Sequence, residues 1–516
     1  MESIFSPASC ATRCNKSFSM TQSQSASRSS TQRWDFIELS FHAPPSAGGN
    51  PFTSQPFSAT FTHLHRGVRV DGFYDGRSSE GQDIYRVRFM PDTLGEWRYD
   101  THSDKAALNG HTGTFTCIAP SEGNHGPVLV RDQFHFAYAD GTPHVSVGTT
   151  CYAWIHQPDA LIAQTLETLK TAPFNKLRMC IFPKHYTYNA NEPALFAYER
   201  DASGNFDHTR FDPAFFQHLE RCVAALRDLN IEADLILFHP YDRWGFAKMD
   251  RESNHRYLRY IAARLSAFRN VWWSMANEFD LMPWLPMQEW DDFFRTVQES
   301  DPVGHLRSVH NCRGFYDYAK PWVTHCSIQH SAVEQTAEWR DQFRKPVVND
   351  ECCYEGNIPN GWGNITAEEL VRRFWETTLR GGYCGHGETY LNPGDGRGHD
   401  VLWWSKGGVL HGHSAPRITF LRQLIEDLPS PKLDPITHLG PNALPCSGVA
   451  GSHYLVYTGY RQPAELPFKL VGDTHYKVDI IDTWNMTITP VAGTFSGEFK
   501  LVLPGRPYQA VRLVKA

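Results

Sequence analysis

The chain has 516 residues, which is enough for two or three domains and too long for one ordinary domain. Hydrophobic residues make up 41% of it and charged residues 20%, a composition typical of globular proteins. Its 49 basic and 56 acidic residues give a net charge of −7, and binding a phosphate backbone needs a basic surface. It also contains no uninterrupted apolar stretch of about 18 residues. We therefore expect neither a nucleic-acid nor a membrane partner.

The amino-terminal residues 1–33 are rich in Ser, Thr and Gln and lack the apolar run of a secretory signal. We interpret residues 1–33 as a disordered leader and expect a cytoplasmic protein. An organellar transit segment stays open, because basic residues in the leader outnumber its single acid, Glu2. The 12 cysteines include no two C-x₂-C pairs, so we expect free buried thiols, no metal and no cofactor.

Two parts of the chain show the alternating pattern of β domains. Residues 34–119 contain short alternating runs separated by Gly and Asp turns, which predicts an N-terminal β-sandwich. Residues 120–127 follow as a linker. Alternation returns over residues 436–516, after the sequence Leu-Pro-Ser-Pro at 428–431, and predicts a small C-terminal β-sandwich.

Between these two regions, residues 128–430 alternate strand-like and amphipathic helical runs, which is typical of parallel βα units. Helices are predicted over residues 161–171, 213–229, 254–264, 287–300 and 367–380. Eight strands are predicted over residues 144–148, 176–182, 233–238, 271–276, 307–310, 325–330, 346–350 and 383–388. Eight units favour a closed (β/α)₈ TIM barrel. A doubly wound open sheet is the alternative, but residues 147–154 lack its Gly-rich phosphate loop. The predicted fold class is therefore multidomain, α/β plus all-β.

Two glutamates follow strands whose carboxyl ends meet at one mouth of such a barrel. The fourth predicted strand ends in Asn277-Glu278, and the seventh ends in Glu351. A single Glu after a strand is usually a solvated loop residue or a partner of a helix cap. Two carboxylates at one barrel mouth are instead the minimum for glycoside hydrolysis, one as proton donor and one as nucleophile or base. The joint occurrence favours catalysis.

These residues give the chain a resemblance to a known family. Asn277-Glu278 on strand four with Glu351 on strand seven resembles the clan A glycoside hydrolases. The motif Gly-Thr-Thr-Cys-Tyr-Ala-Trp at 148–154 and the flanking β domains resemble the apiosidase-like members, and the trailing domain resembles a module whose label refers to collagen binding. The resemblance implies that Glu278 is the acid/base, that Glu351 is the nucleophile and that Asn277 binds the sugar 2-hydroxyl. It also implies that His330 orients the nucleophile.

Other polar and aromatic residues at predicted strand ends suit a polyol substrate. Loop packing is the plainer account of each one taken alone. Glu388 near strand eight is a third acid and a rival for either catalytic role. The predicted substrate-binding set comprises Asn277, His330, Trp154, His185, His239, Arg243, Trp244, His310, Glu388, Trp403 and Trp404.

Competing chemistries lack their motifs. No H-E-x-x-H motif occurs, and no G-x-S-x-G elbow of a serine hydrolase is present. The sequence thus predicts a retaining glycoside hydrolase, exo-acting on a glycoside or short oligosaccharide. The family resemblance implies a pentofuranoside, apiosyl or arabinofuranosyl, or a β-hexoside. The alternative is a non-catalytic carbohydrate- or protein-binding protein on an inactive barrel. A carbohydrate is the expected partner, and a homo-oligomer stays open.

Overall fold

The structure is a computed structural model that describes residues 30–45, 49–54, 56–391, 402–436 and 444–516. Most of the predicted leader, residues 1–29, lies outside the described residues. Its last part does not behave as a leader, because Ser30–Gln32 form strand β1, which pairs in parallel with strand β8 (Thr112–Ile118). The N-terminal domain therefore begins before residue 34. None of the described helices is both long and apolar enough to cross a membrane.

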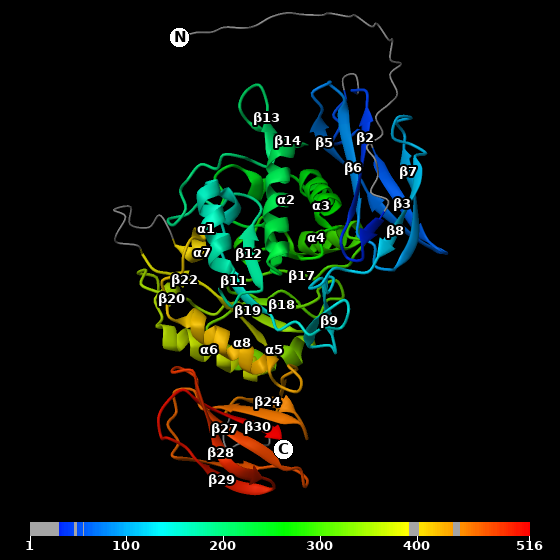
Figure 1. Ribbon diagram of the computed structural model, residues 1–516. Coiled ribbons are helices and arrows are strands. Elements are labelled where there is room, and N and C mark those ends of the chain that lie inside the picture. The colour runs from blue at the N-terminus through cyan, green and yellow to red at the C-terminus, as the bar shows by residue number, and fades with distance from the viewer. Residues whose placement is uncertain (1–29, 46–48, 55, 392–401, 437–443) are drawn as a thin grey trace, which may run out of the picture.

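The N-terminal domain is a sandwich of two sheets with strand orders β1-β8-β7-β3-β4 and β2-β6-β5, antiparallel apart from the β1–β8 pair (Figure 1). Aromatic rings fill the space between the sheets, and Phe61 and Phe89 stack with their centroids 4.3 Å apart. The remaining strands are β2 (Ile37–Ala43), β3 (Phe57–His63), β4 (Arg66–Asp71), β5 (Phe73–Arg77), β6 (Asp83–Phe89) and β7 (Gly95–Ser103).

The middle of the chain forms the predicted parallel barrel, which confirms the fold class. The sheet order is β17-β16-β15-β12-β11-β21-β19-β18, and a parallel bridge between His310 and Ser327 closes the ring. Strand five is shorter than predicted, since only Arg307–Ser308 form β17. The other barrel strands are β11 (Val147–Thr150), β12 (Lys176–Cys180), β15 (Glu232–Phe238), β16 (Val271–Ala276), β18 (Cys326–Gln329), β19 (Val347–Glu351) and β21 (Tyr383–His386).

Helices cover the outside of the barrel (Figure 1). Three of them begin at side-chain caps that satisfy free backbone N–H groups: Asp212 for α2, Asp250 for α3 and Thr366 for α6. The structure adds α5, α7 and α8 to the predicted set. The helices are α1 (Asp159–Leu169), α2 (Pro213–Asp228), α3 (Arg251–Leu265), α4 (Met287–Ser300), α5 (Thr336–Phe343), α6 (Ala367–Leu379), α7 (Trp403–Lys406) and α8 (Ser414–Glu426).

A hairpin of β9 (Val128–Arg131) and β10 (His135–Tyr138) covers the amino-terminal end of the barrel. The Phe136 ring packs against Trp272 near the start of β16, at 5.1 Å, and against Tyr383 at the start of β21, at 5.0 Å. Side chains thus fill that end. Short pairs extend the barrel loops: β13 (Tyr198–Arg200) with β14 (Phe206–Phe211), and β20 (Glu355–Gly356) with β22 (Glu388–Thr389).

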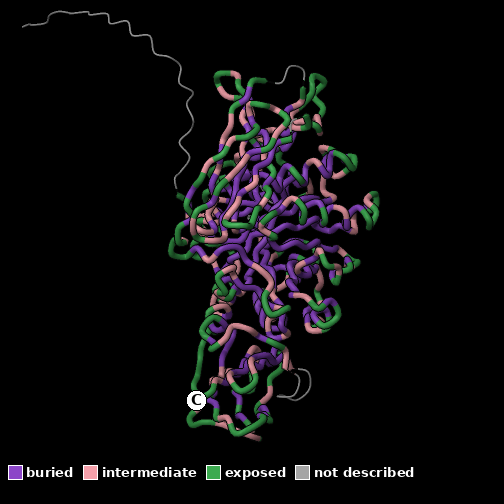
Figure 2. The backbone as a smooth tube through the Cα atoms, turned by 90° about the vertical axis from the view of Figure 1, so that its right-hand side faces the viewer, coloured by how far each residue is buried: buried purple, intermediate pink, exposed green. Residues whose placement is uncertain are grey.

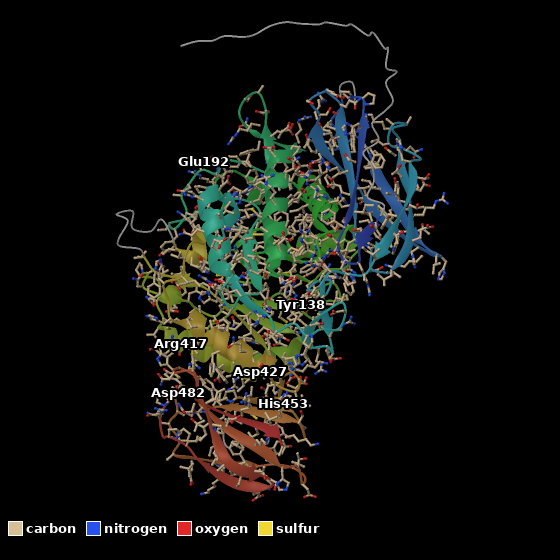
Figure 3. The ribbon with its side chains drawn as sticks, viewed as in Figure 1. Tyr138, Glu192, Arg417, Asp427, His453 and Asp482 are labelled. Carbon is tan, nitrogen blue, oxygen red and sulfur yellow. The ribbon has the colours of Figure 1, made fainter. Side chains whose placement is uncertain are left out.

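The C-terminal domain packs beneath helices α6 and α8. Its six-stranded sheet has the order β23-β24-β25-β30-β27-β28, and β26 pairs with β29. Trp375 of α6 stacks on Tyr457, and Figure 3 labels Arg417 and Asp482 on the two sides of this junction. The strands are β23 (Asp434–Pro435), β24 (Cys446–Val449), β25 (His453–Tyr457), β26 (Glu465–Lys469), β27 (Tyr476–Asp482), β28 (Thr487–Phe495), β29 (Glu498–Val502) and β30 (Gln509–Lys515).

Buried charges join the N-terminal domain to the barrel. Arg88 of β6 donates to the backbone carbonyl of Arg264 on α3, at 2.8 Å, and to the Glu220 carboxylate on α2. Arg264 in turn pairs with Asp75 of β5 at 2.7 Å and with Glu220 at 2.6 Å. Figure 2 shows buried backbone through the middle of the molecule and into both flanking domains. The main hydrophobic cluster likewise includes Phe73 and Tyr457 from those domains.

Candidate active site

Glu278 is the second residue after β16, at the carboxyl end of the barrel. Its backbone has φ of 54°, a left-handed conformation that residues other than Gly rarely adopt and that recurs at functional sites. The hydroxyl of Tyr241 donates a hydrogen bond to Glu278 Oε2, and Nδ2 of Asn277 donates to the same oxygen at 3.3 Å. The carboxyl group is therefore held by two neighbours in a residue that is 7% exposed.

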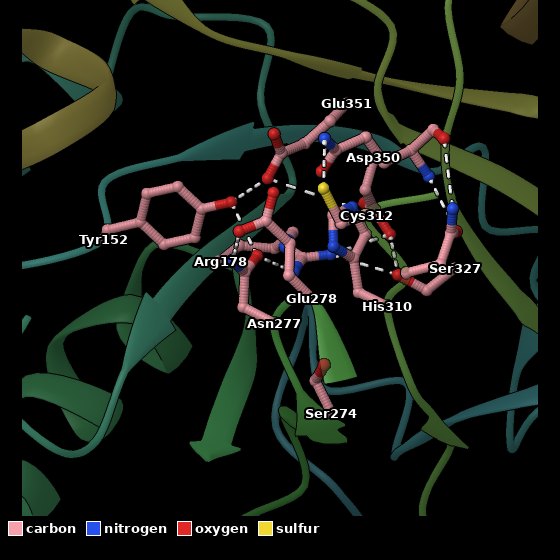
Figure 4. Close-up of polar contacts among 12 residues, drawn as sticks. Tyr152, Arg178, Ser274, Asn277, Glu278, His310, Cys312, Ser327, Asp350 and Glu351 are labelled. Atoms are coloured by element: carbon pink, nitrogen blue, oxygen red, sulfur yellow. Dashed lines mark hydrogen bonds and ion pairs between the residues drawn. The ribbon is translucent and has the colours of Figure 1, made fainter. Parts of the chain in front are cut away.

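Glu351 is the last residue of β19. The hydroxyl of Tyr152, two residues beyond β11, lies within hydrogen-bond distance of both Glu351 Oε1 and Asn277 Oδ1, the latter at 2.8 Å. The hydroxyl carries one proton, so it donates to one of these two oxygens at a time. Because Asn277 also binds Glu278, polar contacts connect the two glutamates without a break (Figure 4). The structure thus brings Asn277 and Glu278, predicted at the end of strand four, together with Glu351, predicted at the end of strand seven.

A buried cluster of opposite charges lies inside the barrel, next to the contacts that connect the two glutamates. Lys176 Nζ lies 2.6 Å from Asp350 and 3.0 Å from Asp234, and Arg178 lies 3.1 Å from Asp350. Burial alone would raise the pKa of Asp350, but the two cations hold it well below its usual value. Arg178 also donates to Asn277 Oδ1 at 3.3 Å. This contact fixes the amide, with its oxygen toward Arg178 and its nitrogen toward Glu278.

The environment of Glu351 favours the protonated carboxyl group in the absence of substrate. Burial raises the pKa of Glu351 to about 8, although the neighbouring Tyr354 opposes the shift. His310 Nε2 lies 3.8 Å from Glu351 Oε1. Burial lowers the pKa of His310 well below its ordinary value, so its imidazole is neutral and adds no positive charge beside Glu351. His310, a predicted site residue, therefore lies beside this carboxyl group as a neutral side chain.

The structure corrects the role predicted for His330. Its backbone N–H donates to the Glu351 carbonyl at 3.1 Å, while its ring Nδ1 accepts from the Ala332 N–H at 3.0 Å and packs against Trp339. The hydrogen bond to the Glu351 carboxyl group comes from Tyr152 instead. His330 therefore supports the backbone at the end of β19 and does not orient the carboxyl group through its ring.

Two further predicted binding residues are part of the barrel wall. Trp154 is completely buried, and its indole N–H donates to the carbonyl of Ile162 at 3.4 Å. His239 is 2% exposed and its Nε2 lies 3.1 Å from the carbonyl of Phe182. Trp154 presents no face on which a sugar could lie, so the prediction for this residue is corrected. The ring Nδ1 of His239 has no hydrogen-bond partner among the described residues, so substrate binding by His239 stays a prediction.

Glu388 is engaged in fastening a loop. Its two oxygens accept hydrogen bonds from the backbone N–H groups of His411, at 2.6 Å, and Gly412, at 2.8 Å. Burial raises the pKa of Glu388 to about 7, against these two hydrogen bonds. Glu355 beside it accepts from the next two N–H groups, of His413 and Ser414. Four consecutive amides are thus bound by two glutamates, and these contacts give Glu388 a role in holding the loop.

Trp403 and Trp404, two tryptophans of the predicted substrate-binding set, lie at different distances from the site. Trp403 is buried, with its indole N–H donating to Thr149 at 2.8 Å. Trp404 lies next to the site, because its ring centroid is 5.3 Å from that of Tyr152. Its neighbour Trp362 reaches the surface, with 36% of its area exposed, and the two rings are 4.8 Å apart.

His185, Arg243 and Trp244 gather farther out, beyond the carboxyl ends of β12 and β15. Arg243 forms an ion pair with Glu192, and the Trp244 indole N–H donates to the same carboxylate at 3.1 Å. The ring of His185 lies edge-on to Trp244 at 6.2 Å. Figure 3 labels Glu192 on the loop that carries this group. These residues form a polar and aromatic group outside the hydrogen-bonded core of the site.

Sequence reasoning placed Tyr152, Lys184 and Tyr241 at predicted strand ends, as general hydroxyl-binding donors and stacking faces for a polyol, and did not predict their contacts around the two glutamates. It gave Arg178 no role. Arg178 lies inside the predicted second strand, where a charged residue in an apolar run indicates that its side chain points into the barrel.

A closed (β/α)₈ barrel with two hydrogen-bonded glutamates at its carboxyl end defines a glycosidase architecture. The model of the apiosidase-like catalytic domain matches residues 131–430. The flanking regions match two domains of unknown function, DUF5060 over residues 30–104 and DUF5605 over residues 443–514. The chain belongs to the apiosidase-like family of glycoside hydrolases, so the predicted family and enzyme class are confirmed and the inactive-barrel alternative is set aside.

Solved structures agree with this assignment. A crystal structure from Bacteroides vulgatus ATCC 8482, described as a "putative glycoside hydrolase", is 40% identical, with a TM-score of 0.87 over 95% of this chain and 100% of that one. A glycoside hydrolase family 5 structure from the same organism is 14% identical, with a TM-score of 0.60 over 76% of this chain and 94% of that one, and is similar in fold. The comparison with curated proteins gave no match.

Proposed function

We propose that this glycosidase works by a retaining mechanism, with Glu351 as nucleophile and Glu278 as acid/base. The observation that carries the proposal is the chain of polar contacts from Glu351 through Tyr152 and Asn277 to Glu278. It fixes two carboxyl groups, from strands four and seven, on opposite ends of one short network. Retaining enzymes need such a pair close together, because the carboxylate itself attacks the sugar.

In the first step, Glu351 attacks the anomeric carbon while Glu278 donates its proton to the leaving oxygen. The covalent glycosyl-enzyme that results splits one difficult displacement into two easier ones. In the second step, Glu278 removes a proton from water, which attacks the same carbon and releases Glu351. Tyr241 and Asn277 hold Glu278 through both steps, and Tyr152 donates to Glu351 as the leaving carboxylate.

The raised pKa of Glu351 sets a condition on this cycle. A nucleophile must be ionised, yet burial raises the pKa of Glu351 to about 8 in the free enzyme. The positive charge that develops on the sugar in the transition state stabilises the carboxylate. Attack needs Glu351 ionised while Glu278 keeps its proton, so the active enzyme carries one proton on the pair, and kcat/KM should follow a bell-shaped pH profile with one limb near pH 8.

For the substrate, we propose an exo-acting enzyme on a pentofuranoside, apiosyl or arabinofuranosyl, or on a β-hexoside. The apiosidase-like family model supports the pentofuranoside, and the polar and aromatic residues around the barrel mouth suit a polyol. A panel of aryl glycosides that differ only in the sugar distinguishes these substrates, and chain-length series of oligosaccharides distinguish exo from endo action.

The experiment that tests the mechanism replaces Glu351 with Ala. Activity should fall by several orders of magnitude, and azide should enter the space, restore turnover of an activated aryl glycoside and give a glycosyl azide of inverted configuration. Glu351→Gln fills the space and should not be rescued. A Glu351→Ala variant that folds and keeps most of its activity without azide would remove Glu351 from the role of nucleophile.

A further inference from the structure

Lys184 occupies an aromatic box beside the two glutamates. It follows β12, is 3% exposed, and its ammonium lies over four rings. The distances from Nζ to the ring centroids are 3.5 Å for Tyr152, 4.3 Å for Tyr241, 4.8 Å for Tyr186 and 5.4 Å for Trp404. Among the described residues, no hydrogen bond or ion pair reaches this ammonium. The rings are thus its principal favourable contacts.

Burying a cation in this way is costly and needs a reason. Burial lowers the pKa of Lys184 to about 8, and the nearby Cys180 and Glu278 oppose the shift only in part. A neutral side chain of similar shape would pack among these rings without that cost. The other buried cations near the site, Lys176 and Arg178, are paired with carboxylates, Lys176 with Asp234 and Asp350 and Arg178 with Asp350.

The two closest rings are the two phenols that hold the glutamates. Tyr152 reaches Glu351 and Tyr241 reaches Glu278, each through its hydroxyl group. A cation over the face of a phenol ring is attracted to the π electrons and draws electron density from the hydroxyl oxygen. The O–H group then becomes a stronger hydrogen-bond donor. One ammonium group therefore acts on both hydroxyl donors at once.

We propose that Lys184 is a positioning residue, whose cation clamps Tyr152 and Tyr241 and strengthens their hydrogen bonds to the two glutamates. The proposal deepens the proposed function and rests on it for the roles of Glu351 and Glu278. Lys184 acts through the phenols and not on the substrate. Its removal should therefore lower kcat while KM changes little, because the loss occurs in the transition state and not in ground-state binding.

The test is a double-mutant cycle on the full chain. Lys184→Met keeps the length of the side chain and removes the charge, and kcat should fall about 10-fold or more. In a Tyr152→Phe/Tyr241→Phe background, which lacks both hydroxyls, the same change should lower kcat less than about 3-fold. Lys248→Met is the matched control, since Lys248 is an exposed lysine 5.2 Å from the ring of Trp284, and it should leave kcat unchanged.

Each outcome decides the proposal. Equal losses from Lys184→Met in the two backgrounds would overturn it, because Lys184 would then act without the phenols, for example on an anionic group of the substrate. A rise in KM with unchanged kcat would overturn it in favour of direct substrate binding. Should Lys184→Met fail to fold, Lys184→Gln enters the same cycle.

The cycle and the mechanism can fail separately. The cycle uses the activity of the wild-type chain, whatever residue is the nucleophile. Absence of azide rescue in Glu351→Ala would overturn the proposed mechanism, while a non-additive cycle would still show Lys184 acting through the two phenols.

Discussion

The hydroxyl of Tyr152 donates to the carboxyl group of Glu351, although 199 residues separate them in the chain. Tyr152 comes from the loop after the first barrel strand, and Glu351 ends the seventh. Closure of the ring brings the eighth strand against the first and so carries both residues to the same mouth. Through Asn277 the same hydroxyl is also linked to Glu278, and the first prediction addresses its contact with Glu351.

Tyr152→Phe removes this donor and keeps the ring. Under the proposed mechanism the carboxylate that leaves in the second step loses a hydrogen bond, and kcat should fall about 10- to 100-fold. Steady-state kinetics on an aryl glycoside measure the loss. Tyr186→Phe is the control, because the Tyr186 hydroxyl bonds Ser405 at 2.7 Å and not a glutamate. Equal losses in the two variants would deny Tyr152 a specific role.

Glu278→Ala separates the two catalytic roles. The variant lacks the proton donor and keeps the nucleophile, so glycosides with poor leaving groups should lose far more activity than activated aryl glycosides. The slope of log kcat/KM against the pKa of the leaving group should become steeper than in the wild type. An unchanged slope would mean that Glu278 is not the general acid.

Glu351→Gln should alter the pH dependence of stability. Burial raises the pKa of Glu351 to about 8 from 4.5, so the folded chain keeps a proton that the unfolded chain loses between these values. The wild type should therefore lose stability as pH rises through this window, by at most about 5 kcal/mol, and the loss should be complete above pH 8. Glu351→Gln does not titrate and lacks this loss.

The measurement is Tm of both proteins from pH 4 to pH 9. The advantage of the Gln variant should grow between about pH 4.5 and pH 8 and stay constant above. A constant difference across the range would show that the pKa of Glu351 is not raised.

Asp350→Asn tests the charge cluster under the site. It removes the carboxylate that Lys176 and Arg178 share and leaves Asp234 as the partner of Lys176 only. Loss of one partner from a buried ion pair costs about 3–5 kcal/mol, because the remaining charge stays buried. Denaturant unfolding measures the change. Asp341→Asn, on the exposed surface of α5, should have almost no effect, and a similar small effect for Asp350→Asn would contradict the argument.

The barrel and its two glutamates could be predicted because both depend on local patterns. Strand periodicity, and the rule that sites lie at the carboxyl ends of barrel strands, pointed to Asn277, Glu278 and Glu351. The partners of these residues depend on side-chain direction. Tyr152 and Trp154 both follow strand one. The Tyr152 hydroxyl points into the barrel mouth, whereas the Trp154 indole points into the barrel wall.

Charge and burial were also outside the reach of the sequence. The histidine at the end of strand six has a ring that turns to Ala332, which no spacing rule reveals. Glu388 was a reasonable third acid by position, yet its two oxygens bind consecutive backbone amides that come from a loop more than 20 residues later. Such long-range pairings follow from closure of the fold and not from any short motif.

Arg88 and Arg264 form buried ion pairs across the interface between the N-terminal sandwich and the barrel. This interface therefore contributes to the stability of both domains. A barrel cut free at residue 128 would leave Arg264 without Asp75 and Glu220 without Arg88. It would also expose the wall that Phe73 covers. We therefore expect the isolated catalytic domain to be less stable than the barrel with its N-terminal sandwich, and these two domains to unfold together.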